Sequence, residues 1–193
     1  MIKIGVLALQ GAFAKHRQML LSFNVSCVEI RKPQDLQDCD ALIIPGGEST
    51  TMLKQMQFID LVKPFLEFAA HKPIFGTCAG LILMSNHILN DPMQPFNLLD
   101  IEVERNAYGR QIESFSAEFA ADLGQSLKKS IKGLFIRAPR IRKWGPEIQV
   151  LASLDNEPVL VRQGIHLGAT FHPELTDSNA VHRYFLQACL KNK

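Results

Sequence analysis

The chain lacks any apolar run that approaches the ~18 residues required to span a membrane as a helix. Its N-terminus, MIKIGVLALQG, has no basic segment and no small-residue cleavage site, so it indicates a first strand rather than a secretory signal. The formal net charge of +2 is too small to indicate nucleic acid or an anionic membrane as the main partner. These absences favour an ordinary globular protein, and 193 residues predict a single domain over 1–193.

Cysteine is scarce as well. The four cysteines form no CxxC pair and no cluster, so the sequence predicts neither a disulfide framework nor a zinc site. Without a secretory signal we expect free thiols in a reducing cytosol, and therefore a cytoplasmic protein. We interpret Cys27, Cys39 and Cys189 as structural thiols, whereas Cys78 stands in a different context.

Strands and helices alternate in the first half of the chain. This alternation predicts right-handed βαβ units and a parallel sheet with both faces covered. Apolar runs predict buried strands at 2–9, 25–31, 41–45 and 73–77. Helical spacing of apolar residues predicts helices at about 12–23, about 50–70 and 79–88.

Short extended runs fill most of the second half. Several alternate between apolar and polar residues, and turn residues separate them, which predicts antiparallel or mixed strands beside the parallel core. The runs are LDIEVERN, SFSAEFA, GLFIRAP, IQVLASL, PVLVRQG and IHLGATF. A final helix is expected at about 178–191. The predicted class is therefore α/β, with a mostly parallel central sheet and added antiparallel strands.

Cys78 lies in FGTCAG, after a predicted strand and before a predicted helix. G-x-C-x-G has the form of a nucleophile elbow with cysteine in place of serine. Gly76 and Gly80 allow the backbone to bend and the helix to pack closely, so that the thiol projects above the sheet. The start of a helix also favours the thiolate. A buried structural cysteine is the alternative, and the bracketing glycines favour the nucleophile.

A thiolate nucleophile needs a base and a group that orients the base. His172 is the best placed of six histidines, because it follows the predicted strand LGATF and precedes Pro173 and Glu174. Residues i and i+2 of an extended stretch point to the same side, so we expect Glu174 to reach the imidazole. The carboxyl ends of parallel strands share one edge, where Cys78 and His172 can meet. The other histidines, interpreted as surface or structural residues, are His16, His71, His87, His166 and His182.

The segment PGGEST, residues 45–50, follows another buried strand. Its adjacent glycines expose backbone N–H groups that can bind an oxyanion or a carboxylate. It is not a Walker loop, because no lysine follows at the required place. A plain turn with Ser49 as the N-cap of the next helix is the other interpretation, and both can hold together.

These three loops, in this order, resemble the class I glutamine amidotransferases, which carry a Cys–His–Glu triad on a flavodoxin-like three-layer sandwich. Within that class the chain resembles the glutaminase subunits of pyridoxal 5′-phosphate synthases, from residue 2 to about residue 187. LQG, PGGEST and RNAYGRQ are the most specific part of this resemblance. The matching segments are LALQGAFAKH, IIPGGESTTM, FGTCAGLILM, VERNAYGRQIESF, FIRAPRI and TFHPELTD.

The resemblance implies hydrolysis of L-glutamine to L-glutamate and ammonia. Cys78 would form a γ-glutamyl thioester, and His172, oriented by Glu174, would protonate the leaving ammonia and later activate water. Backbone N–H groups of Gly47 and Ala79 would form the oxyanion hole. The glutamine-binding residues implied by position are Gly47, Glu48, Ser49, Arg105, Ile136 and Arg137.

The resemblance also implies a partner, a (β/α)8 synthase subunit, in a complex of twelve synthase and twelve glutaminase subunits. That partner combines the ammonia with ribose 5-phosphate and glyceraldehyde 3-phosphate for vitamin B6 biosynthesis. Gln10 would lie at the contact, and docking would set the oxyanion hole beside Gly47. We expect no cofactor and no metal, because glutaminases of this kind carry no pyridoxal phosphate themselves.

Two other functions stay open. Another glutaminase of the class, such as the subunit that feeds imidazole glycerol phosphate synthase, shares the triad, although PGGEST and RNAYGRQ favour the vitamin pathway. A flavodoxin-like binding module with a redox-sensing cysteine would not need Glu174 beside His172. A further open point is the segment 123–146, which contains seven basic residues and no acidic ones. It indicates either a solvated surface or a contact with a partner, in which Arg140, Arg142 and Lys143 would take part.

Overall fold

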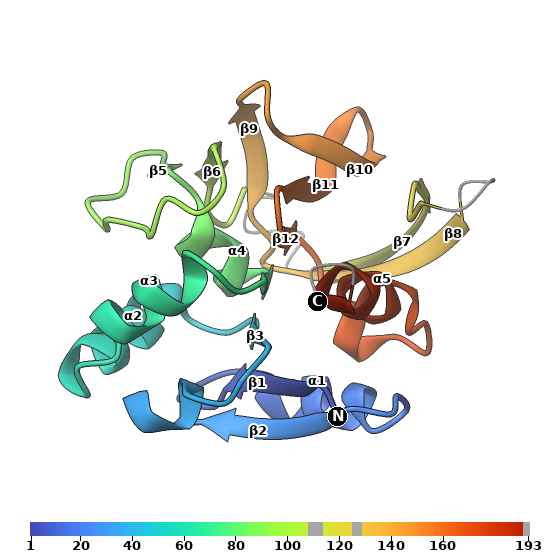
Figure 1. Cartoon of the computed structure of the whole chain (residues 1–193). Coiled ribbons are helices and arrows are strands. Elements are labelled where there is room, and N and C mark those ends of the chain that lie inside the picture. Colours follow the sequence, from blue (N-terminus) through green and yellow to red (C-terminus); the bar gives the residue numbers. More distant parts are fainter. Residues whose placement is uncertain (108–113, 125–128, 191–193) are drawn as a thin grey trace.

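The computed structural model describes residues 1–107, 114–124 and 129–190, and a nine-stranded sheet runs through its centre (Figure 1). The strands of this sheet are β1 (Lys3–Leu7), β2 (Ser26–Ile30), β3 (Ala41–Ile44), β4 (Ile74–Thr77), β7 (Ser114–Ala121), β8 (Lys129–Ile136), β10 (Gln149–Leu154), β11 (Glu157–Gln163) and β12 (His166–Ala169). Their order across the sheet is β2-β1-β3-β4-β12-β11-β10-β7-β8.

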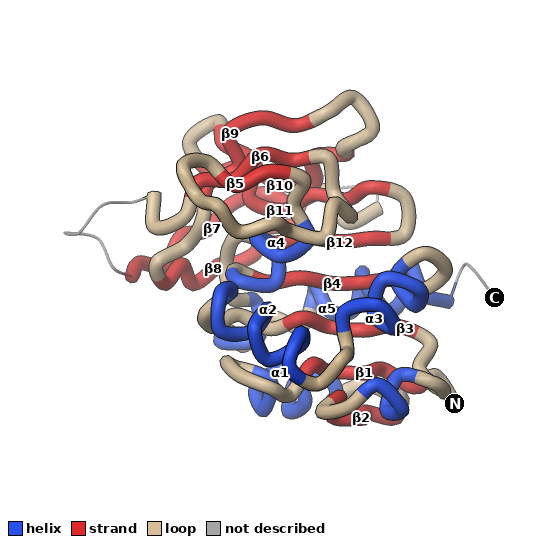
Figure 2. Tube along the Cα trace, turned by 90° about the vertical axis from the view of Figure 1, so that its left-hand side faces the viewer, coloured by secondary structure: helices blue, strands red, loops and turns tan. Residues whose placement is uncertain are grey.

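The sheet has a parallel half and an antiparallel half. In Figure 2 the parallel strands lie one above another, from β2 at the bottom through β1, β3 and β4 to β12. From β12 onward, each neighbouring pair is antiparallel. A smaller three-stranded sheet contains β5 (His87–Ile88), β6 (Ile101–Glu104) and β9 (Arg140–Trp144). The predicted α/β class, with antiparallel strands added to a parallel core, is confirmed.

Helices cover both faces of the parallel half. They are α1 (Phe13–Leu20), α2 (Ser49–Phe58), α3 (Val62–Ala69), α4 (Ala79–Met84) and α5 (Ala180–Leu190), with short 3-10 turns η1 (Pro33–Leu36) and η2 (Pro173–Leu175). In the part of the chain that the structure describes, no helix is long and apolar enough to cross a membrane.

Successive residues of a central strand pack into different layers. Ile4 and Val6 of β1 belong to the cluster that contains Leu20 of α1 and Phe185 of α5. Leu7 belongs instead to the cluster formed with α2, α3 and α4. Because side chains of a strand point alternately to its two faces, both faces of β1 are buried. This explains why its sequence is a continuous apolar run.

Two helical segments differ from the sequence prediction: one is divided, and the other ends earlier than expected. The helix expected at about 50–70 is divided into α2 and α3 near Asp60, whose φ is 55°. The helix expected over 79–88 ends at Met84, because Ser85 is extended and residues 87–88 form β5. Every residue of α4 is buried. Such a helix has no polar face, so its sequence carries no periodic signal that marks its end.

The strand β9 contains part of the basic segment, and the charge pattern does not predict a strand there. Arg142 lies 2.6 Å from Glu104 and 2.7 Å from Glu157, and Lys143 lies 2.9 Å from Glu102. The carboxylates come from the neighbouring strands β6 and β11, so these cations are neutralised within the chain. Residues 125–128 of the basic segment 123–146 lie outside the described residues. A contact between this segment and a partner stays a hypothesis.

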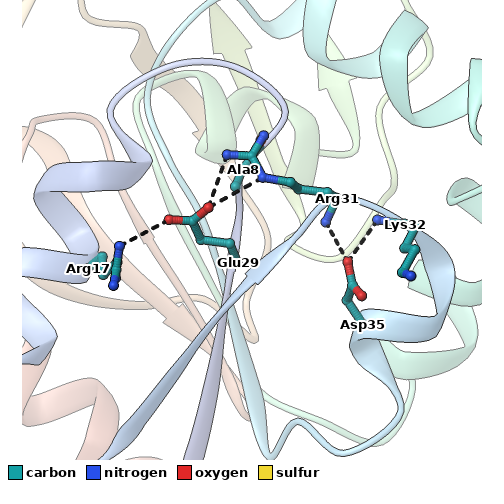
Figure 3. A network of polar contacts seen from close by, with 6 residues as sticks. All are labelled: Ala8, Arg17, Glu29, Arg31, Lys32 and Asp35. Atoms are coloured by element: carbon teal, nitrogen blue, oxygen red, sulfur yellow. Dashed lines mark hydrogen bonds and ion pairs between the residues drawn. The ribbon is translucent and has the colours of Figure 1, made fainter.

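Arg31, at the end of β2, braces the loop that joins β1 to α1 (Figure 3). Its Nη1 donates to the carbonyl oxygen of Ala8 at 2.8 Å, and its Nη2 donates to Glu29 at 3.0 Å. The guanidinium also lies 5.3 Å from the centroid of the Phe13 ring, at the start of α1. Arg17 contacts the same Glu29 at 3.4 Å. One side chain thus connects β2 to both ends of the loop.

We predict that Arg31→Ala lowers the free energy of unfolding by about 1–2 kcal/mol, because the carbonyl of Ala8 loses a charged donor. Arg17→Ala is the matched control, since it removes only an exposed pair with Glu29, and it should cost less than about 0.5 kcal/mol. Urea unfolding of both variants measures the difference. Equal costs for the two variants would contradict the bracing role of Arg31.

Candidate active site

Cys78 occupies the turn between β4 and α4 in a strained backbone conformation, with φ of 49° and ψ of −103°. Positive φ is unfavourable for residues with a Cβ, so the surrounding contacts must hold it. The N–H of Cys78 donates to the carbonyl oxygen of Ala169 in β12 at 2.8 Å. A Cβ on Gly76 would collide with the backbone of Gly80, and a Cβ on Gly80 would collide with the carbonyl of Ile44. Both glycines therefore permit the turn, as expected.

His172 reaches the same edge of the sheet because β12 pairs in parallel with β4. Its Nδ1 lies 2.7 Å from Oε1 of Glu174, and its imidazole lines the same cavity as Cys78. His172 and Glu174 are only 6% and 4% exposed. Since Nδ1 is occupied by Glu174, Nε2 is the nitrogen left for the thiol. The structure thus brings together the three residues that the sequence singles out.

The local geometry of this pair differs from the expected one. Glu174 lies in the 3-10 turn η2, for which His172 is the N-cap residue, and not in an extended stretch. The contact with His172 therefore depends on a tight turn rather than on the alternation of a strand. Pro173 is the first residue of this turn, where its fixed φ is well accommodated.

Contacts within and beside the triad shift the pKa values of His172 and Glu174 in opposite directions. Burial alone would lower the pKa of His172, but its contacts with Cys78 and Glu174 raise that pKa above the ordinary value. Burial would raise the pKa of Glu174, yet His16 and His172 hold it well below the usual range of a carboxyl group. An ionised Glu174 next to a basic His172 favours the imidazolium form of His172.

The PGGEST loop lies directly against the triad and against the loop that contains Gln10. A Cβ on Gly46 would collide with the ring of His172, so only glycine fits there. The N–H of Glu48 donates to Oε1 of Gln10 at 2.7 Å, and the same oxygen would meet a Cβ on Gly47 at 2.5 Å. The side chain of Gln10 thus holds the peptide group between Gly47 and Glu48 and packs closely against Gly47.

A cavity of about 500 Å³ opens above Cys78. Of the predicted site residues, Glu174 and Ala79 do not line it: Glu174 lies behind His172, and Ala79 is the first residue of α4. The first N–H groups of a helix have no acceptor within it, which leaves that of Ala79 available. The predicted residues that do line the cavity are Gln10, Gly47, Glu48, Ser49, Cys78, Arg105, Ile136, Arg137 and His172.

The family comparison agrees with this geometry. A family model described as the SNO glutamine amidotransferase family matches residues 6–191. The chain belongs to this family. The predicted resemblance is therefore confirmed, and the chain is an enzyme of the glutamine amidotransferase type.

Curated relatives match along nearly their whole length. A protein of Thermosipho africanus named pyridoxal 5′-phosphate synthase subunit PdxT is 42% identical over 98% of this chain and 100% of its own. A protein of the same name from Solibacter usitatus is 48% identical over 96% of this chain and 98% of its own.

Solved structures agree on the fold. A crystal structure described as a glutamine amidotransferase has a TM-score of 0.90 and 43% identity, and it covers 96% of this chain and 98% of its own. The structure of PurLQS from Thermotoga maritima has a TM-score of 0.70, with 96% and 98% of the two chains covered. Its identity is 15%, so it shows a shared fold alone.

The amidotransferase cavity holds Arg105 at its edge between two acidic side chains. Nη1 of Arg105 lies 2.6 Å from Asp91 and 3.2 Å from the hydroxyl of Thr50, and Nη2 lies 3.2 Å from Glu48. The N–H of Met93 and the guanidinium of Arg105 hold the pKa of Asp91 below its usual value. Asp91 lies in an irregular loop, and no sequence pattern singles it out. Residues 108–111, which complete RNAYGRQ, lie outside the described residues.

Ser49 presents an unsatisfied hydroxyl at the cavity. Its Oγ is buried and has no hydrogen-bond partner among the described residues. The interpretation of Ser49 as a helix N-cap is wrong: Glu48 is the N-cap residue, Ser49 is the first helical residue, and neither makes a side-chain cap. A buried hydroxyl beside an open cavity is a ready partner for a polar ligand atom.

Two of the remaining histidines are not surface residues. His16 and His182 are both 0% exposed, and His16 approaches Glu174 from the side opposite to His172. The sequence gives no signal for this placement, because a lone histidine in an amphipathic helix looks the same whether it is buried or exposed. Within the ranges that the structure describes, no group of three or more His, Cys, Asp or Glu residues could hold a metal ion.

The buried position of His182 predicts a dependence of stability on pH. Burial and the neighbouring His16 lower the pKa of His182 from 6.5 to about 3. As the pH falls through this window, the unfolded chain binds a proton that the folded chain does not, so the free energy of unfolding decreases. We predict that His182→Phe weakens this decrease, whereas His71→Phe, at an exposed position, leaves it unchanged.

Urea unfolding of these variants at about pH 5 and about pH 7 gives the two free energies to be compared. A decrease of the same size in His182→Phe and in the unsubstituted chain would show that His182 does not cause it.

Proposed function

We propose that this chain hydrolyses L-glutamine to L-glutamate and ammonia and supplies the ammonia to a pyridoxal 5′-phosphate synthase, in the cytoplasm. The observation that carries the proposal is the contact of Cys78, His172 and Glu174 beneath the cavity, in a chain of the glutamine amidotransferase family. The pathway is inferred from the relatives, which are named pyridoxal 5′-phosphate synthase subunit PdxT.

In the proposed reaction, the thiolate of Cys78 attacks the side-chain amide carbon of glutamine. The C–N bond breaks, the nitrogen takes a proton from Nε2 of His172, and ammonia leaves a γ-glutamyl thioester. His172, now neutral, removes a proton from a water molecule that attacks the thioester carbon. Glutamate leaves with the new C–O bond, and the imidazolium–thiolate pair is restored. Glu174 keeps its charge and stabilises His172 throughout.

The oxyanion of each tetrahedral intermediate requires donors, and we assign this role to the backbone N–H groups of Gly47 and Ala79. Gln10 supports the assignment for Gly47, because its side chain already accepts a hydrogen bond from the adjacent N–H of Glu48. A synthase that contacts Gln10 can therefore change the orientation of the peptide group at Gly47. We propose that docking sets the oxyanion hole in this way.

Glutamine binding is assigned to the walls of the cavity. A guanidinium suits the α-carboxylate, and Arg105 and Arg137 both line the cavity. Glu48 offers a carboxylate for the α-ammonium, and Ser49 offers its unpaired hydroxyl. Ile136 contributes its carbonyl, which also lies 3.8 Å from Sγ of Cys78.

The proposed partner is a synthase subunit with a (β/α)8 barrel, in a complex of twelve synthase and twelve glutaminase subunits. The second candidate is a glutaminase for imidazole glycerol phosphate synthase, which would have the same triad. The relatives are instead named as subunits of pyridoxal 5′-phosphate synthase. The redox-sensing module gives no reason for Glu174 to contact His172.

We predict that 6-diazo-5-oxonorleucine labels Cys78 and that labelling and glutamine hydrolysis both increase when the synthase is added. Cys78→Ala should lower glutamate release at least about 10³-fold with the synthase present. Mass spectrometry locates the label, and a coupled glutamate assay measures the rate. Full activity without the synthase would contradict partner control. Activation by an imidazole glycerol phosphate synthase barrel instead would establish the second candidate.

We also predict that Ser49→Ala raises the KM for glutamine on the order of tenfold while kcat changes little, because a ground-state hydrogen bond is lost. Ser22→Ala, at an exposed position after α1, is the control. Steady-state kinetics in the presence of synthase measures both constants. An unchanged KM would remove Ser49 from the binding site.

A further inference from the structure

A buried chain of hydrogen-bonding groups continues behind the triad, on the side away from the cavity. While Oε1 of Glu174 faces His172, its Oε2 lies 3.4 Å from Nε2 of His16. The same Nε2 lies 3.2 Å from the hydroxyl of Thr77, and Nδ1 of His16 lies 3.0 Å from Nε2 of His182. His16, Thr77 and His182 are each 0% exposed. The reaction proposed above uses none of these three residues.

Four separate elements supply this chain. His16 lies in α1, His182 in α5, Thr77 at the end of β4 directly before Cys78, and Glu174 in η2. The helices α1 and α5 pack on the same face of the sheet. The rings of His16 and His182 are tilted at 49° with centroids 5.2 Å apart, and both rings contact Phe75. The group is thus enclosed by the core.

The positions of the protons follow from which atoms can donate. An ionised carboxylate only accepts, so we assign a proton to Nε2 of His16, where it can be shared between Oε2 of Glu174 and the hydroxyl oxygen of Thr77. When Nε2 carries the only proton of the His16 ring, Nδ1 is an acceptor, and Nε2–H of His182 is its donor. This leaves Nδ1 of His182 without a proton. That atom is indeed buried and without a hydrogen-bond partner among the described residues.

In this assignment both hydrogen bonds run in the same direction, from His182 through His16 toward Glu174. His182 donates to His16, and His16 faces Oε2 of Glu174 at 3.4 Å, an oxygen that is buried and has no hydrogen-bond partner among the described residues. A buried carboxylate oxygen that faces no donor carries the desolvation penalty of a charged group without compensation. His16 is the group placed to offset that cost. Catalytic hydrogen bonds are often long in the free enzyme and shorten in the complex.

We propose that His16 is a positioning residue for the triad: its Nε2–H holds the second oxygen of Glu174, and His182 fixes its tautomer. With Oε2 held, the carboxylate keeps the orientation in which Oε1 meets Nδ1 of His172. His16 and His182 would thus support the triad of Cys78, His172 and Glu174 from behind. This role rests on the proposed glutaminase function. His16 touches neither substrate nor thiol, so it acts only through Glu174.

Two amide substitutions at position 16 test the direction of this hydrogen bond. The amide nitrogen of glutamine occupies the place of Nε2 and can donate to Glu174, whereas that of asparagine reaches only the place of Nδ1. We expect His16→Asn to lower kcat on the order of tenfold with little change in KM, because misplacement affects the chemical step. His16→Gln should retain a kcat clearly above that of His16→Asn.

His166→Leu is the control for loss of stability. His166 lies at the opposite end of β12, where its Nδ1 accepts a hydrogen bond from the N–H of Ile74 at 3.3 Å. We expect this variant to lose stability but to keep its kcat where it is folded. Urea unfolding of each variant defines the conditions under which the assays are done.

Alkylation of Cys78 by iodoacetamide provides a readout that does not need glutaminase activity. The rate follows the thiolate, which depends on the charge of His172 and hence on Glu174. The charged and titratable groups around Glu174 are His16, His172 and His182. We expect His16→Asn to slow alkylation at neutral pH and to move its rise to higher pH, and His16→Gln to move it less. Peptide mapping separates Cys78 from Cys27 and Cys39.

The outcomes are distinct. If the unsubstituted chain with synthase releases no glutamate, the proposed function fails, and alkylation still decides the role of His16. If His16→Asn matches the unsubstituted chain in kcat and in alkylation profile, the positioning role is overturned. Both variants keep an amide at this buried site, and they differ in whether the amide nitrogen reaches the place of Nε2. Equal losses in His16→Asn and His16→Gln would therefore overturn the assigned direction of the hydrogen bond.

Discussion

The parallel pairing of β12 with β4 is the constraint on which the site depends. It aligns Ala169 with Thr77, and the backbone of Ala169 then accepts the N–H of Cys78. Both chains leave the sheet at the same edge, one toward the nucleophile and the other toward His172. The same pairing joins the parallel half of the sheet to the antiparallel half. A shift of one residue in its register would separate Cys78 from His172 and move each side chain of the shifted strand to the opposite face of the sheet.

Backbone strain gathers around the cavity that this pairing creates. Cys78, Asn106 and Arg137 all have positive φ, at 49°, 51° and 42°, and all three line it. Such conformations persist only where neighbouring contacts fix them. At Cys78 these contacts are the hydrogen bond to β12 and the close approach of the two bracketing glycines. The cavity is therefore shaped by the backbone as much as by the side chains.

Much of this arrangement follows from the sequence. Apolar runs and their spacing predict β1, β3 and β4, and glycines at fixed positions around Cys78 predict the elbow. Long-range placement is harder to predict: the burial of His16 and the contact of Asp91 with Arg105 arise when distant elements pack, and neither leaves a local pattern. The extended geometry expected for Glu174 is wrong for a related reason, since a 3-10 turn and a strand end look alike beside a proline. The sequence of α4, which is fully buried, likewise has no periodic pattern that marks where the helix ends.

The short segment from Gln10 to His16 touches two different parts of the proposed chemistry. Gln10, at its start, contacts the peptide groups next to Gly47, and His16, one helical turn into α1, faces the carboxylate behind the base. Arg31 attaches the beginning of this segment to the neighbouring strand. A displacement of the segment as one body therefore alters charge stabilisation and proton transfer simultaneously.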